Sequence, residues 1–90
     1  MFTIQLSHTT RKALDKLPPN VVKKIFIHLG ELRRDPYRPR PMADIVPVAG
    51  SDKKYRLRVG KLRVEYEVDG DENIIKLLKI FPKKRKSDYR

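Results

Sequence analysis

The chain of 90 residues contains no cysteine and no tryptophan, and it has only two histidines. Without cysteine, disulfide bonds and thiolate zinc sites are both excluded. No apolar run approaches the ~20 residues that a membrane-spanning helix needs. The first residues also lack the basic and then apolar segments of a secretory signal. We therefore expect one small domain that works in the cytoplasm.

Acidic residues are scarce relative to basic ones. The chain has 11 Asp and Glu against 22 Lys and Arg, which gives a net charge of +11. So large an excess on a small body attracts polyanions. Proteins from hot environments are also rich in charged residues, but that enrichment raises both signs together. The charge therefore favours a nucleic acid or a strongly acidic protein as the partner.

The first third of the chain predicts a strand and two helices. Alternating apolar and polar residues predict a strand over residues 2–6. A short helix follows, with Ser7 or Thr9 as its N-cap, and it ends at Pro18. Pro19 suits the first turn of a second helix, so the two helices are expected to form an antiparallel hairpin. The apolar stripe of the second helix is predicted from its spacing: Val22, Ile25, Phe26, Leu29 and Leu32.

The middle of the chain predicts a loop and a hairpin. Residues 35–52 hold four of the seven prolines and read as an extended loop, with at most a short strand near residues 45–48. Alternation then returns in two segments, residues 54–59 and 62–68. Gly60-Lys61 between them suits a type II′ turn, so the two segments are expected to pair as a β-hairpin.

A third strand and a basic tail complete the chain. Asp69-Gly70-Asp71 predicts a turn into residues 74–81, whose nearly continuous apolar character indicates a central strand. The tail, residues 82–90, is basic. The predicted fold class is α+β in a single domain over residues 1–90. It consists of an N-terminal strand, an antiparallel helix hairpin and a three-stranded antiparallel meander, which form one sheet with the helices on one face.

The predicted turn determines which residues of the hairpin face each other. If Gly60-Lys61 closes a two-residue loop, Arg58 lies directly opposite Arg63, and Arg56 lies opposite Glu65. Like charges directly opposite each other destabilise a hairpin. The pair is suited to hold a doubly anionic group, such as a phosphodiester near its transition state. The alternative is that the arginines separate into water and that Glu65 neutralises Arg56 as an ordinary surface pair.

The distribution of basic residues along the chain favours phosphate binding by the arginine pair. Residues 53–63 contain six cations and no acid, and residues 76–90 contain seven cations against Asp88 alone. We expect the following residues to bind the phosphates of a nucleic acid: Lys53, Lys54, Arg56, Lys61, Lys84 and Lys86. Tyr89, an aromatic residue within the basic tail, is suited to stack on a base.

Other chemistries have little support in the sequence. His8 and His28 are too far apart to suggest a pair, and His28 adjoins the apolar stripe of the second helix. No carboxylate pair, Ser–His arrangement, metal-ligand cluster or glycine-rich phosphate loop is recognisable. We therefore expect no metal and no cofactor.

The hairpin segment carries a family resemblance. The run from Tyr55 to Gly60, followed by Leu62-Arg63-Val64 and Tyr66, resembles the RelE/ParE toxin family. Leu17-Pro18 at the bend of the helix hairpin adds to the likeness, which covers essentially the whole chain. Within the family, the sequence is more similar to the RelE-like mRNA interferases, archaeal ones in particular, than to the gyrase-poisoning ParE branch.

The resemblance implies a microbial RNase-like fold that enters the ribosomal A site and cleaves mRNA without a metal. In such toxins the 2′-hydroxyl attacks the adjacent phosphate. By the resemblance, Arg63 binds the phosphate, and Arg56 and Arg58 match basic positions of the family on the first strand of the meander. Lys83 or Arg85 would protonate the leaving group, and Tyr89 would stack on a base. The well-known relatives carry lysine at positions 56 and 58, and arginine is a poor general base. Either Tyr89 or a positioned water takes the proton, or the site works by alignment and charge stabilisation.

The resemblance also implies partners. Toxins of this family bind the 30S A site with its mRNA, and a cognate acidic RelB-like antitoxin wraps around them, which predicts a toxin–antitoxin hetero-oligomer. A carboxylate-rich segment is suited to cover the face of Arg56, Arg58 and Arg63. Two other functions stay open. The chain could be a topoisomerase inhibitor of the ParE type, or a non-catalytic RNA-binding protein whose cations only bind phosphates.

Overall fold

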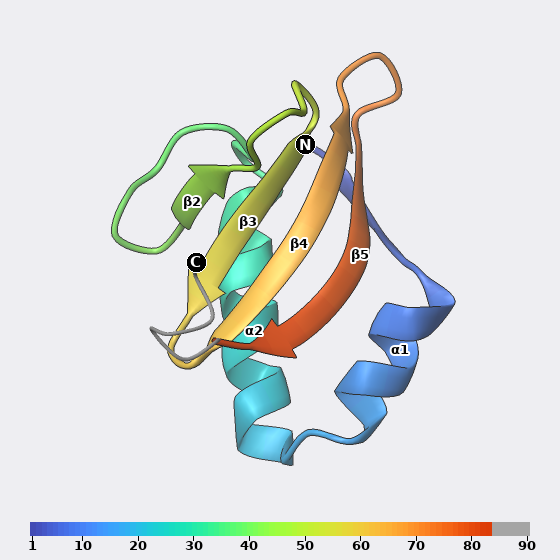
Figure 1. Ribbon diagram of the computed structural model, residues 1–90, viewed down its shortest axis with the longest axis vertical. Helices are drawn as coiled ribbons and strands as arrows, with labels where there is room; N and C mark the ends of the chain where they lie inside the picture. Colours follow the sequence, from blue (N-terminus) through green and yellow to red (C-terminus); the bar gives the residue numbers. More distant parts are fainter. Residues whose placement is uncertain (84–90) are drawn as a thin grey trace.

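The computed structural model describes residues 1–83 of the chain as two helices and a five-stranded sheet (Figure 1). The elements in chain order are β1 (Thr3–Leu6), α1 (His8–Asp15), α2 (Pro19–Leu32), β2 (Asp44–Pro47), β3 (Lys54–Val59), β4 (Leu62–Asp69) and β5 (Ile74–Pro82). The predicted α+β class, the helix pair and the meander are all confirmed. No helix among the described residues is long and apolar enough to cross a bilayer.

The sheet is built around the predicted meander. Its strand order is β1-β5-β4-β3-β2, in which β3, β4 and β5 are antiparallel neighbours. β1 pairs with β5 in parallel at one edge, and β2 pairs with β3 in antiparallel at the other edge. The apolar run of β5 therefore lies between two strands, as its composition predicted.

Both helices lie on one face of the sheet. Ser7 is the N-cap of α1, since its Oγ accepts a hydrogen bond from the Thr10 amide at 3.1 Å. The Thr10 hydroxyl is buried and donates to the Leu77 carbonyl at 3.0 Å, which ties α1 to β5. Pro19 begins α2 as predicted. The two helices run in opposite directions, with α1 against β5 and α2 behind β3 and β4 (Figure 1).

The core lies between the helices and the sheet. One prediction about it is wrong: Phe26, expected in the buried stripe of α2, is 50% exposed. Ile25, Leu29 and Leu32 are buried, and their spacing of four and then three residues defines the line that faces the sheet. Phe26 is one residue further around the helix, about 100° from Ile25, so it points away from this line.

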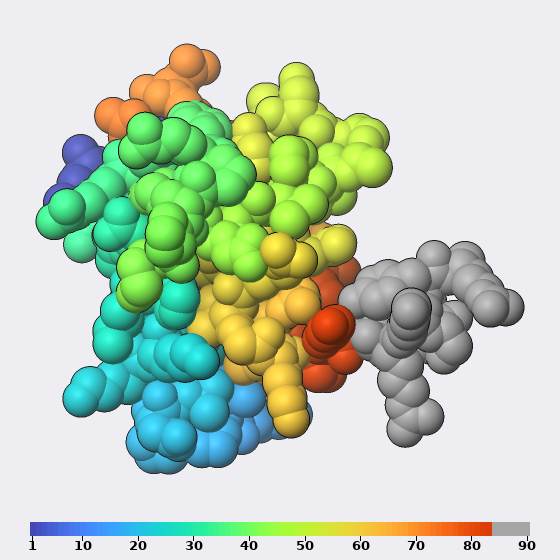
Figure 2. Space-filling view, turned by 90° about the vertical axis from the view of Figure 1, so that its left-hand side faces the viewer, coloured from blue at the N-terminus to red at the C-terminus, as the bar shows by residue number. Residues whose placement is uncertain are grey.

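Tyrosine side chains attach the proline-rich loop before β2 to the sheet. The buried Tyr66 hydroxyl donates a hydrogen bond to the Pro36 carbonyl at 2.7 Å. Tyr55 stacks on Tyr66 with ring centroids 5.7 Å apart, and Tyr37 meets Tyr55 edge-on at 5.8 Å. Figure 2 shows this loop, in green, spread over the upper part of one side of the molecule. These contacts hold the segment from which β2 enters the sheet.

Candidate functional site

The β3–β4 hairpin has the predicted register. Gly60 has a positive φ of 57°, as the first central residue of a type II′ turn requires, and Lys61 does not. A Cβ at Gly60 would lie 3.3 Å from Lys24 Nζ, the end of an exposed side chain that can move aside. The observed pairs include Val59 with Leu62, Arg58 with Arg63, Leu57 with Val64 and Arg56 with Glu65.

The charged side chains of the hairpin lie on the sheet face opposite the helices, here called the open face. Strand pairing places them in two rows that cross the sheet from β2 to β5. The first row is Asp44, Arg58, Arg63 and Phe81, and the second is Val46, Arg56, Glu65 and Lys79. Each row therefore places at least one arginine beside a carboxylate.

A groove of about 360 Å³ on the open face gathers several of the predicted site residues. Its lining is Val46, Arg56, Arg58, Arg63 and Lys83, and we call it the arginine groove. Lys83 reaches it because its backbone amide donates to the Lys61 carbonyl at 2.7 Å, beside the β3–β4 turn. The groove thus combines residues from β2, β3, β4 and the segment after β5.

Arg58 is held by a residue that the sequence analysis did not single out. Its Nε and Nη2 atoms donate to the two carboxylate oxygens of Asp44 at 2.9 and 3.0 Å. Asp44 is the direct cross-strand neighbour of Arg58 on β2. The predicted short strand near residues 45–48 was the only sequence signal for this contact, and it did not indicate which strand would be the neighbour.

Arg56 is held by Glu65 and by an aromatic ring. Its Nη2 atom lies 3.1 Å from Glu65 Oε1, and its guanidinium carbon lies 5.5 Å from the centroid of the Phe81 ring. The Lys79 ammonium also lies over this ring, at 5.1 Å. Arg56 Nε is buried and has no hydrogen-bond partner among the described residues. The Arg56–Glu65 pair expected from the sequence is confirmed.

Arg63 folds back on its own turn. Its Nη1 atom donates to the carbonyls of Gly60 and Leu62 at 3.0 and 2.8 Å. Both arginines of the Arg58–Arg63 pair therefore donate to hydrogen-bond acceptors. Arg58 donates to a carboxylate, and Arg63 donates to two backbone carbonyls. These contacts offset the repulsion that two opposed arginines would otherwise suffer.

The other predicted phosphate-binding residues do not all join the groove. Lys54 lies on β3 directly opposite Glu67, and Lys61 is exposed in the turn. Lys53 precedes β3 at the opposite end of the strand from Arg58. The predicted residues Lys84, Arg85, Lys86 and Tyr89 lie outside the described residues.

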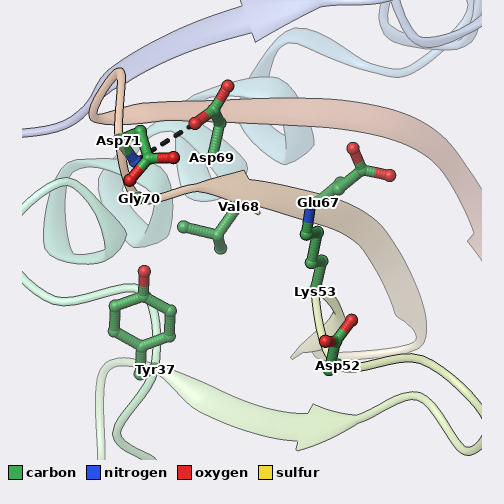
Figure 3. Close-up of a pocket in the computed structure, with 8 residues that line it drawn as sticks. All are labelled: Tyr37, Asp52, Lys53, Glu67, Val68, Asp69, Gly70 and Asp71. Carbon is green, nitrogen blue, oxygen red and sulfur yellow. Dashed lines mark hydrogen bonds between the residues drawn. The ribbon is translucent and has the colours of Figure 1, made fainter.

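The surroundings of Lys53 are acidic. It borders a cavity of about 440 Å³ between the loop before β3 and the β4–β5 turn (Figure 3). Four carboxylates line this cavity, those of Asp52, Glu67, Asp69 and Asp71. Burial raises the pKa of Tyr37 at its wall, and the nearby Asp69 adds to the increase. This cavity is larger than the arginine groove, but its carboxylates repel a phosphate, so we place the functional site at the arginines.

Comparisons with known proteins identify the family. Residues 4–87 match the family model of the ParE toxin of type II toxin–antitoxin systems, parDE. The chain is also 38% identical over 79 residues to the protein named RelE1 from Methanocaldococcus jannaschii, covering 88% of this chain and 87% of the relative. The chain belongs to the RelE/ParE toxin family. The resemblance seen in the sequence is therefore confirmed.

Solved structures of RelE toxins have the same fold. RelE in the archaeal RelE–RelB complex from Pyrococcus horikoshii is 29% identical to this toxin, with a TM-score of 0.81 over 93% of this chain and 97% of that one. The isolated E. coli RelE toxin superposes with a TM-score of 0.80 over 99% of this chain and 92% of that one, at 15% identity. The second comparison supports the fold alone.

Proposed function

We propose that this toxin is a ribosome-dependent endoribonuclease that cleaves mRNA in the A site and so stops translation in the cytoplasm. The observation that carries the proposal is the arginine groove. It gathers four cations, Arg56, Arg58, Arg63 and Lys83, on one face. The carboxylates of Asp44 and Glu65 hold two of the arginines, which leaves two positive charges. That charge matches the dianionic transition state of phosphodiester cleavage.

In the proposed reaction the 2′-oxygen of the RNA attacks the adjacent phosphorus and the bond to the 5′-oxygen breaks. The products are a 2′,3′-cyclic phosphate and a 5′-hydroxyl. Arg58 and Arg63 would bind the non-bridging oxygens, because a guanidinium fork matches two phosphate oxygens. Lys83, which lines the groove, is the described candidate to protonate the leaving 5′-oxygen, and Arg85 is the alternative outside the described residues.

The proposed mechanism depends on alignment and charge. The groove lining within residues 1–83 contains no histidine and no carboxylate, and its arginines cannot give up a proton near neutral pH. His28 does not line the groove, and its Nδ1 lies 2.9 Å from the Met42 carbonyl oxygen. We assign Tyr89 to base stacking, so the 2′-hydroxyl proton passes to a water that the bound RNA and ribosome hold in place.

An acidic RelB-like antitoxin is the proposed protein partner. The related toxin structures from Pyrococcus horikoshii and Methanococcus jannaschii are complexes of RelE with RelB. The net charge of +11 on this chain favours an acidic binding partner. We propose that its carboxylates cover the arginine groove in a toxin–antitoxin hetero-oligomer, which would exclude RNA from the site.

Inducing the toxin in cells and mapping the 5′ ends of mRNA tests this function. Cuts in phase with codons, found only in translated messages and bearing 5′-hydroxyl ends, support ribosome-dependent cleavage. A DNA-damage response without cuts would instead indicate a ParE-type topoisomerase inhibitor. Growth inhibition with neither sign would indicate a non-catalytic RNA-binding protein. Induction of Arg63→Ala is the control, because it should remove the cuts without removing the protein.

A further inference from the structure

Arg58 lies between a carboxylate and a second arginine within one row of the sheet. Asp44 on β2 and Arg63 on β4 are its two direct cross-strand neighbours. Two arginines opposite each other repel, and Asp44 attracts the Arg58 guanidinium from the side away from Arg63. Asp44 is therefore placed where it contributes to the orientation of Arg58.

The contact between Asp44 and Arg58 is directional. Both carboxylate oxygens take part, with Nε to Oδ2 at 2.9 Å and Nη2 to Oδ1 at 3.0 Å. Such a two-point contact defines the plane of the guanidinium as well as its distance. It uses the Nε–Nη2 edge, whereas Nη1 belongs to the other edge of the group. The contact with Asp44 therefore does not use Nη1.

The same pair contributes little to folding. The side chains of Arg58 and Asp44 are 49% and 46% exposed, and ion pairs of that exposure stabilise proteins by only about 0–1 kcal/mol. Asp44 itself is well anchored, because its chain neighbours Ala43 and Ile45 are buried. Arg40 and Ala43 also form a backbone bridge just before β2. A rigid carboxylate in an exposed, directional contact is better suited to orientation than to stability.

We propose that Asp44 is a positioning residue for phosphate binding. Its carboxylate fixes the direction of the Arg58 guanidinium in the arginine groove, which Arg63 also lines, before RNA arrives. This role rests on the proposed ribonuclease activity. The expected gain in cleavage rate comes from geometry, because a guanidinium that is already oriented does not have to be ordered when the transition state forms.

Asp44→Asn tests the role, because it keeps the shape of the side chain and removes the second acceptor oxygen and the charge. We expect kcat for single-turnover cleavage on programmed ribosomes to fall roughly 10- to 100-fold. KM should not rise, because the groove becomes more positive, and the melting temperature should not change. Asp44→Glu, which keeps a carboxylate, should recover part of the rate. Asp71→Asn makes the same charge change at the β4–β5 turn and should have no effect.

The order of the Arg58 side chain gives a second readout. ¹⁵N NMR relaxation of Arg58 Nε should show a rigid group in the wild-type toxin and a flexible one in Asp44→Asn. An unchanged or increased kcat in Asp44→Asn would overturn the proposal, as would an equally mobile Arg58 in both proteins or a fall in melting temperature. If the wild-type toxin does not cleave RNA, the proposed function fails, while the NMR comparison still decides whether Asp44 positions Arg58.

Discussion

Arg56 and Glu65 face each other across β3 and β4, and their side chains form an ion pair with Nη2 and Oε1 3.1 Å apart. The glutamate side chain is only 12% exposed, and that of the arginine is 39% exposed. Partial burial makes this pair different from ordinary surface pairs, because an arginine that loses its partner here stays partly out of water.

We predict that Glu65→Gln lowers the free energy of unfolding by about 1–2 kcal/mol. Arg56 would then lack its counter-charge, and its Nε already has no hydrogen-bond partner within residues 1–83. A double-mutant cycle of Arg56→Met and Glu65→Gln, measured by urea denaturation, should give a coupling energy of about 1 kcal/mol. The Arg38–Asp35 pair, at 3.7 Å and with an arginine side chain that is 75% exposed, is the control and should couple near zero. Equal coupling in the two cycles would contradict this prediction.

Arg58→Ala and Arg63→Ala should separate activity from stability. We expect each to lower single-turnover cleavage by about 10²-fold or more, because each removes a group placed for phosphate charge. The unfolding free energy should change by less than about 1 kcal/mol, since the Arg58 ion pair is exposed and removing either arginine relieves repulsion. Arg34→Ala, at an exposed position in the turn after α2, is the matched control. A large loss of stability in either groove variant would make these arginines structural.

Gly60 should matter for the site, and Gly50 should matter for folding alone. Both have positive φ, 57° and 82°, so alanine at either position should cost roughly 1–2 kcal/mol of stability. Gly60 also lies in the turn that joins the strands of Arg58 and Arg63, so a change of its backbone conformation would move these two residues relative to each other. We therefore expect Gly60→Ala to reduce cleavage more than Gly50→Ala, at similar melting temperatures. Equal activities would show that the turn does not control the groove.

The hairpin of the site could be predicted from the sequence because its constraints are local. A two-residue turn at Gly60-Lys61 leaves one register, and that register places Leu57 and Val64 together in the core. The arginines on the other side of the strands then follow by alternation. The nearly continuous apolar run of residues 74–81 also predicted an interior strand, and β5 indeed lies between β1 and β4.

Asp44 could not be predicted in the same way. It contacts Arg58 because β2 pairs with β3. The loop between these strands has no short turn that would define which residues face each other. Lys53 was grouped with the site because it is close to Arg56 in sequence, but consecutive cations of one segment can lie at opposite ends of a strand. Counting charges along the chain gives their number but not their distribution over the surface.

Tyr66 should make stability sensitive to high pH. Burial raises the pKa of its hydroxyl well above the ordinary value of 10.0. The folded state therefore favours the protonated form, so the stability is fully present below about pH 10 and is lost as the pH rises above it. Tyr66→Phe should remove this part of the pH dependence when urea denaturation is compared from pH 8 to 11. At neutral pH the same change should cost about 1–2 kcal/mol, because the Pro36 carbonyl loses its donor. Parallel curves for both proteins would refute the prediction.

The pH dependence of cleavage should reveal how the 2′-hydroxyl loses its proton. The groove within residues 1–83 offers arginine and lysine, whose ordinary pKa values are about 10 or higher, and no histidine lines it. We predict that the single-turnover rate keeps rising with pH beyond neutrality, without a maximum near 6 to 7 of the kind that a histidine pair produces. Rates measured on programmed ribosomes from pH 5.5 to 9 test this.

Tyr89→Phe then distinguishes the two roles of the tyrosine, which lies outside the described residues. The variant keeps the ring and removes the hydroxyl, so stacking alone predicts a nearly unchanged rate, whereas a general base predicts a loss of ~10²-fold or more. We expect the unchanged rate, because the groove already supplies the charge that cleavage by alignment requires. A hundredfold loss with unaltered ribosome binding would assign the proton transfer to Tyr89.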